Sequence, residues 1–183
     1  MPAECVLENH GTCFLRTNLM RVAELEFAFR MSADIMPRAA IHSLGEVMER
    51  VATLHPAIEI PDSRYEHFQS VGAPQLIADN ACAHLFVLGS ASPETWRSID
   101  LAGHQVWGTI NDTARHPGLG RNVLGDPRIA LTWLVNELSQ HGIPLRGGEV
   151  VTTGACLTPL RIAVGDRMRG DFGALGEVSI TIA

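Results

Sequence analysis

The stretch Val22-Ala-Glu-Leu-Glu-Phe-Ala-Phe-Arg-Met31 decides the fold, because apolar and polar side chains alternate along it. In an extended strand, successive side chains point to opposite faces of the sheet. The alternation places Leu25, Phe27, Phe29 and Met31 on one face, and Glu24, Glu26, Ala28 and Arg30 on the other. We therefore predict a strand from Arg21 to Met31 with one apolar face and one acidic face.

A helix and a second strand are predicted next. Apolar residues recur at helical spacing from Ile41 to Leu54, with Pro37 near the start of the helix. The segment His55–Pro61 alternates again, with Ile58 and Ile60 opposite Glu59. Short helices or turns are expected over residues 63–71 and 74–82, and apolar strands over 84–89 and 104–110.

The second half of the chain predicts a loop, a helix and a series of strands. Residues 111–125 are rich in Gly, Asn and Asp and read as a loop, after which Asp126 caps a helix with Pro127 in its first turn. This helix should run to about His141, end at Gly142 and bury Ile129, Trp133, Leu134 and Leu138. Strands are expected over 149–153, 161–164, 167–172 and 177–182.

These elements predict one strand-dominated α+β domain over residues 21–183, preceded by an irregular lead-in over residues 1–20. The chain of 183 residues contains no internal repeat and no linker. Its net charge of −6 without a basic cluster argues against nucleic acid as a partner. No apolar run is long enough for a membrane span and no signal-peptide pattern opens the sequence, so we expect no membrane association and a cytoplasmic location.

All fourteen basic residues are arginines, which excludes a Schiff base or a lysine general base within this chain. The four cysteines are scattered and are expected to be free thiols. A zinc site at Cys5, His10 and Cys13 is the less favoured interpretation, because the spacing matches no common zinc motif.

Three glutamates form the candidate metal site. Glu24 and Glu26 project from one strand face about 6–7 Å apart at their Cα atoms, so either one stays protonated or a cation lies between them. Glu59 joins them if the two strands are neighbours. Carboxylate oxygens suit Mg²⁺, Ca²⁺ or Mn²⁺. The competing interpretation is that the glutamates belong to the solvated face of an amphipathic sheet.

Two further places are candidate site residues. Asp79 and Asn80 precede an apolar strand, and they are either a turn pair or catalytic groups. The segment Thr152-Thr153-Gly154 ends another strand, and its backbone and hydroxyls either line a substrate pocket, with Thr153 and Gly154 as the candidate contacts, or simply terminate the strand.

The ordered set of segments resembles a known family. It comprises Val22–Phe29, His55–Arg64, Ile77-Ala-Asp-Asn-Ala81, Phe86-Val-Leu-Gly89, Val123–Pro127 with the Trp133-Leu helix, Val151-Thr-Thr-Gly154, Gly165-Asp166 and Phe172–Ser179. The family is the 2-keto-4-pentenoate hydratase and 4-oxalocrotonate decarboxylase group of the fumarylacetoacetate hydrolase superfamily.

The resemblance implies a mixed β roll or barrel with flanking helices, usually in an oligomer. It also implies Mg²⁺ or Mn²⁺ on Glu24, Glu26 and Glu59, acting as a Lewis acid on a small 2-oxo or 2-hydroxydienoate acid. The expected activity is that of a hydro-lyase, which adds water to a 2-hydroxy-2,4-dienoate to give a 4-hydroxy-2-oxo acid.

One departure from the family bears on activity. Typical members carry an N-terminal segment with a lysine and an acidic residue near the substrate, and residues 1–18 do not resemble it. We therefore expect hydratase activity that is impaired, with a 4-oxalocrotonate-type decarboxylase or an acylpyruvate hydrolase on the same metal as alternatives. A non-catalytic subunit or scaffold is the alternative of another class. As partner we expect a second copy of the chain in a homo-oligomer, or a related decarboxylase or hydratase subunit.

Overall fold

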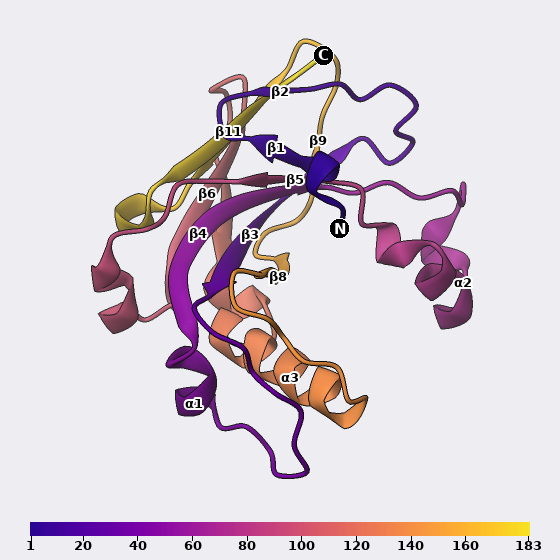
Figure 1. Ribbon diagram of the computed structural model, residues 1–183. Coiled ribbons are helices and arrows are strands. Elements are labelled where there is room, and N and C mark those ends of the chain that lie inside the picture. The colour runs from indigo at the N-terminus through magenta and orange to yellow at the C-terminus, as the bar shows by residue number, and fades with distance from the viewer.

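The computed structural model describes residues 1–183 as two mixed β-sheets with few helices (Figure 1). The first sheet has the order β1-β5-β4-β3-β8, with β9 also paired to β3, and the second has the order β2-β11-β10-β6-β7. The strands are β1 (Val6–Glu8), β2 (Thr12–Cys13), β3 (Val22–Met31), β4 (Val51–Ile60), β5 (Leu85–Leu88), β6 (Gln105–Ile110), β7 (His116–Leu119), β8 (Val150–Ala155), β9 (Leu160–Arg161), β10 (Arg167–Asp171) and β11 (Glu177–Ile182). The α-helices are α1 (Leu44–Met48), α2 (Ala73–Ala78) and α3 (Pro127–Gln140).

The predicted α+β architecture is confirmed, but each sheet is an open path and no closed barrel is formed. The predicted roll or barrel is therefore not confirmed. No helix is both long and apolar enough to cross a lipid bilayer.

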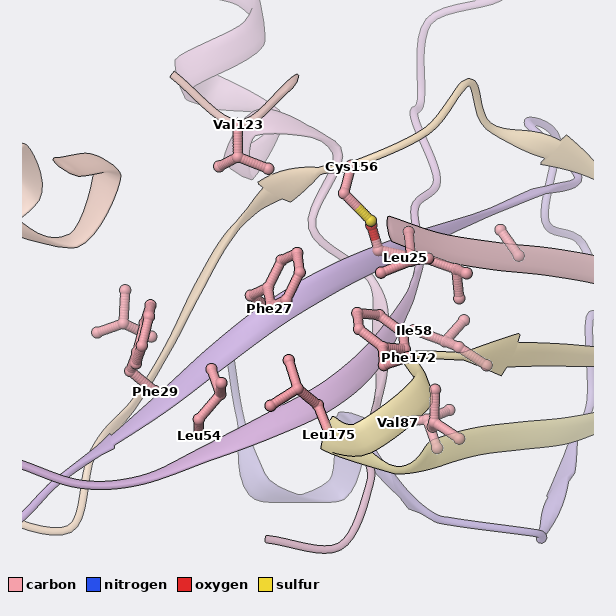
Figure 2. Close-up of a cluster of buried hydrophobic side chains, with 14 of the residues drawn as sticks. Leu25, Phe27, Phe29, Leu54, Ile58, Val87, Val123, Cys156, Phe172 and Leu175 are labelled. Carbon is pink, nitrogen blue, oxygen red and sulfur yellow. The ribbon is translucent and has the colours of Figure 1, made fainter. Parts of the chain in front are cut away.

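Strand β3 builds the core with its apolar face. It pairs antiparallel with β4, so that Leu25 lies opposite Ile58. Figure 2 shows Leu25 and Phe27 among buried side chains of the core, together with Phe172 from the segment after β10. The rings of Phe27 and Phe172 meet edge to face at 5.2 Å between centroids, a favourable aromatic geometry.

The helix predicted from Ile41 to Leu54 is wrong at both ends. Helix α1 covers only Leu44–Met48, begins at a capping box of Ser43 and Glu46, and gives way to β4 at Val51. The apolar residues at 51–54 share the helical spacing, but they lengthen β4 to ten residues and pair with the end of β3. Ladder hydrogen bonds with β3 thus override the local periodicity.

The lead-in expected to be irregular contains two short strands. Strand β1 pairs parallel with β5, and β2 pairs parallel with β11. The loop expected over 111–125 contains β7, and the strand expected over 161–164 is reduced to β9. Short edge strands of two to four residues carry too few residues for an alternating pattern to be recognised.

Helix α3 has the predicted limits, but a different face is buried. Leu131 and Val135 are buried, whereas Ile129 and Trp133 are 46% and 56% exposed. Leu134 and Leu138 pack partly buried against the core. Apolar residues surround most of this helix, so spacing alone could not show which side meets the sheet.

Truncation on α3 tests this face. We expect Leu131→Ala to lower the free energy of unfolding by about 2–5 kcal/mol, because it opens a cavity in the core. The exposed neighbour provides the matched control, and Ile129→Ala should stay within about 1 kcal/mol. Urea denaturation of both variants measures the difference, and similar losses would contradict the observed orientation of the helix.

Candidate metal centre

Glu24, Glu26 and Glu59 converge on one face of the first sheet, as the sequence predicted. Glu24 lies directly opposite Glu59 in the β3–β4 ladder, and Glu26 follows two residues along β3 on the same face. Each residue offers one carboxylate oxygen, and these oxygens all lie within 4.8 Å of one another. No other group of three acidic, histidine or cysteine side chains converges in this way, so Cys5, His10 and Cys13 form no such cluster.

The cluster is partly shielded from solvent. Glu26 is only 2% exposed, and Glu24 and Glu59 are half-buried. Ala28 and Ala57 continue the same face of the sheet and are fully buried. Burial therefore disfavours the charged forms of Glu24 and Glu59.

Burial and mutual repulsion shift the acidity of the cluster. Burial raises the pKa of Glu59 to about 8, aided by the negative charges of Glu26 and Glu24 and by a hydrogen bond to Glu26. Burial also raises the pKa of Glu24, and the charge of Glu26 adds to that effect. A proton on Glu59 or a cation between the carboxylates relieves this repulsion, and a cation would displace the proton.

Strand β8 supplies two donors to Glu26. The Thr152 hydroxyl and the Gly154 backbone N–H both donate to Oε2 of Glu26, the latter at 2.7 Å. The Thr153 hydroxyl instead donates to the carbonyl oxygen of Phe27 at 2.9 Å. The predicted substrate-binding residues Thr153 and Gly154 thus lie beside the cluster with their donors already engaged, and their substrate role stays a prediction.

The contact of Thr152 was missed by sequence analysis. The register between β3 and β8 shifts between the pairs Glu26–Ala155 and Ala28–Thr152, and this irregularity turns both donors towards one carboxylate. The sequence Thr152-Thr153-Gly154 marked this segment as a candidate. It predicts neither the pairing of β8 with β3 nor the register shift between them.

Asp79 and Asn80 lie outside this arrangement. Asp79 accepts hydrogen bonds from the Ser63 hydroxyl and the Arg64 guanidinium, each at 2.6 Å, and these bonds lower the pKa of Asp79. Asn80 is exposed with a φ of 54°. Neither residue hydrogen-bonds to the three glutamates, and the geometry matches the turn role. Their catalytic role stays a prediction.

No family model matches the chain, but the chain is similar to several known enzymes. The chain is 32% identical over 158 residues to 2-hydroxyhexa-2,4-dienoate hydratase of Comamonas testosteroni, covering 86% of this chain and 58% of that enzyme. It is 32% identical over 160 residues to 2-keto-4-pentenoate hydratase 1 of Dechloromonas aromatica strain RCB, covering 87% and 59%. The chain therefore spans less than two thirds of these relatives.

A solved structure shows the same fold. The 4-oxalocrotonate decarboxylase from Pseudomonas putida G7, complexed with magnesium and adipate, superposes with a TM-score of 0.88 at 25% identity. The match covers 98% of this chain and 67% of that one. Together with the two hydratases, it confirms the resemblance read from the sequence.

The pKa of Glu59 predicts how stability depends on pH. Because the folded pKa of about 8 lies above the ordinary 4.5, the contribution of Glu59 to stability is greatest at low pH and is lost as pH rises through about 8. We expect the melting temperature in EDTA to fall as pH rises from about 5 to about 8, and Glu59→Gln to flatten this slope.

A matched control lies on α1. Glu46 is a partly exposed carboxylate whose pKa is about 2, lowered first by a backbone hydrogen bond from Ser43 and then by Arg38. Glu46→Gln should leave the slope above pH 6 unchanged. Equal slopes in the unsubstituted chain and the Glu59→Gln variant would show that Glu59 does not carry the effect.

Proposed function

We propose that this chain, which is related to the 2-keto-4-pentenoate hydratase and 4-oxalocrotonate decarboxylase family, is a metal-dependent hydro-lyase that adds water to a 2-hydroxy-2,4-dienoate. The main support for this proposal is that carboxylate oxygens of Glu24, Glu26 and Glu59 lie within 4.8 Å of one another on one face of the sheet. The 32% identity to a dienoate hydratase over most of the chain supports the reaction class.

The three glutamates fit a hard divalent cation. All three ligand atoms are carboxylate oxygens, and burial together with the negative charge of Glu26 raises the pKa values of Glu24 and Glu59. Mg²⁺ is the proposed ion, supported by the magnesium complex of the related decarboxylase, with Mn²⁺ as its substitute. Such an ion supplies a Lewis acid for the carboxylate and 2-oxo oxygens of the substrate.

The chain's own groups supply orientation. Glu26 is fixed by Thr152 and Gly154, so its position does not depend on the ion alone. Thr153 and Gly154 lie next to it and are proposed to contact the substrate. None of residues 1–183 is a lysine, so a proton donor among them would be another kind of side chain.

Decarboxylation of a 2-oxo diacid is the second candidate. It is favoured by the TM-score of 0.88 to a decarboxylase complexed with a dicarboxylic acid, adipate. A cation held by the same three carboxylates would serve both reactions, because each develops negative charge on the 2-oxo oxygen. We propose a homo-oligomer, or a complex with a related subunit, as the working form.

Substitution of a ligand tests metal binding. We expect Glu59→Ala to weaken Mn²⁺ binding at least about tenfold, because it removes one of three ligands. The neighbouring carboxylate Asp62 accepts hydrogen bonds from the backbone N–H groups of Leu19 and Met20 and belongs to no metal cluster. Asp62→Ala should therefore keep its affinity in calorimetric titration, and equal losses would mean that the third ligand is misassigned.

Activity is tested with 2-hydroxypenta-2,4-dienoate and Mg²⁺. We expect loss of the dienol absorbance with the unsubstituted chain, and at least about a hundredfold slower loss with Glu26→Gln, since the metal site is then incomplete. Release of CO₂ from 4-oxalocrotonate, without consumption of the dienoate, would select the decarboxylase instead. A folded chain that binds Mn²⁺ and consumes neither compound would support the non-catalytic alternative.

A further inference from the structure

The contact between β8 and Glu26 depends on an irregular point in the sheet. Between the pairs Ala28–Thr152 and Glu26–Ala155, β8 carries one more residue than β3. Gly154 lies in this extra length with a φ of 106°, a conformation that L side chains rarely adopt. The extra residue has the character of a β-bulge, which re-aims the groups of a strand.

Two donors reach the same oxygen because of this geometry. The Thr152 hydroxyl and the Gly154 N–H both contact Oε2 of Glu26, and neither contacts Oε1. A carboxylate held through one oxygen by two donors keeps its orientation when its neighbours change. The other oxygen of Glu26 receives no hydrogen bond from β8.

We propose that Thr152, together with the Gly154 backbone, positions Glu26 as a metal ligand, so that Thr152 is a positioning residue of the acidic cluster. The inference rests on the proposed metal-dependent function. Glu26 would ligate the cation through Oε1 while β8 holds Oε2. Outer hydrogen bonds of this kind fix ligand orientation and tune affinity in metal sites generally.

The surroundings of the Thr152 hydroxyl argue against a role in packing or backbone support alone. Thr152 is exposed, so its side chain fills no space in the core. The adjacent Thr153 already links β8 to the backbone of β3, because its hydroxyl donates to the Phe27 carbonyl oxygen. The Thr152 hydroxyl is directed instead at the one glutamate of the three that is almost fully buried.

The test replaces the hydroxyl while keeping the shape of the side chain. We expect Thr152→Val to weaken Mn²⁺ binding about tenfold or more, and Thr152→Ser to restore it to within about threefold. Thr109→Val is the matched control, because the Thr109 hydroxyl is buried in the other sheet without a hydrogen-bond partner. All three variants should melt within a few degrees of the unsubstituted chain in EDTA.

The backbone donor is tested separately. Gly154→Ala adds a side chain where only Val123 comes within 4.0 Å, so its effect arises from the positive φ and the resulting displacement of the N–H. Gly125→Ala is the matched control, because Gly125 has a φ of 86° and open space around it. We expect Gly154→Ala, and not Gly125→Ala, to reduce the rise in melting temperature caused by Mn²⁺.

The outcomes separate the inference from the function on which it rests. Binding of Mn²⁺ by the unsubstituted chain, with equal affinity in Thr152→Val, would overturn the positioning role and leave the metal proposal standing. Failure of Thr152→Ser to recover affinity would also overturn it, because the hydroxyl would then not be the active group. Absence of Mn²⁺ binding by the unsubstituted chain would overturn the metal proposal and this inference with it.

Discussion

The antiparallel register between β3 and β4 is the constraint on which the rest of the structure depends. It sets Glu24 opposite Glu59 and, one residue further, Leu25 opposite Ile58. Side chains alternate between faces, so a slip of one residue would turn the carboxylates into the core and the core residues outward. The apolar face is buried against the second sheet (Figure 2), and this burial holds the acidic face in register.

Keeping three carboxylates on a partly buried face opposes folding unless their charges are compensated. The chain compensates in two ways, with donors from β8 on Glu26 and with a proton retained by Glu59. A divalent cation would replace the proton and satisfy all three groups together. Without a cation, the repulsion among the three carboxylates therefore destabilises the folded chain. Local destabilisation of this kind is common at functional sites, where function and stability compete.

Sequence predicted the elements whose signal is local. The alternation in β3 and the Asp126 cap of α3 gave correct limits, and the paired Glu24 and Glu26 identified the acidic cluster before its geometry was known. What it could not predict depends on partners distant in the chain. The extension of β4 needs β3 beside it, the buried face of α3 needs the sheet, and the contact of Thr152 needs a register shift in β8.

The donors on β8 follow Glu26 by 126 and 128 residues, whereas the Glu24–Glu59 pair closes over a much shorter loop. During synthesis the three carboxylates can meet long before β8 has left the ribosome. Until then Glu26 lacks both of its donors from β8, and its carboxylate is free to reorient. The hydrogen bonds from β8 to Glu26 are consequently late, long-range contacts in folding. They form only when β8, from the C-terminal half of the chain, pairs with β3.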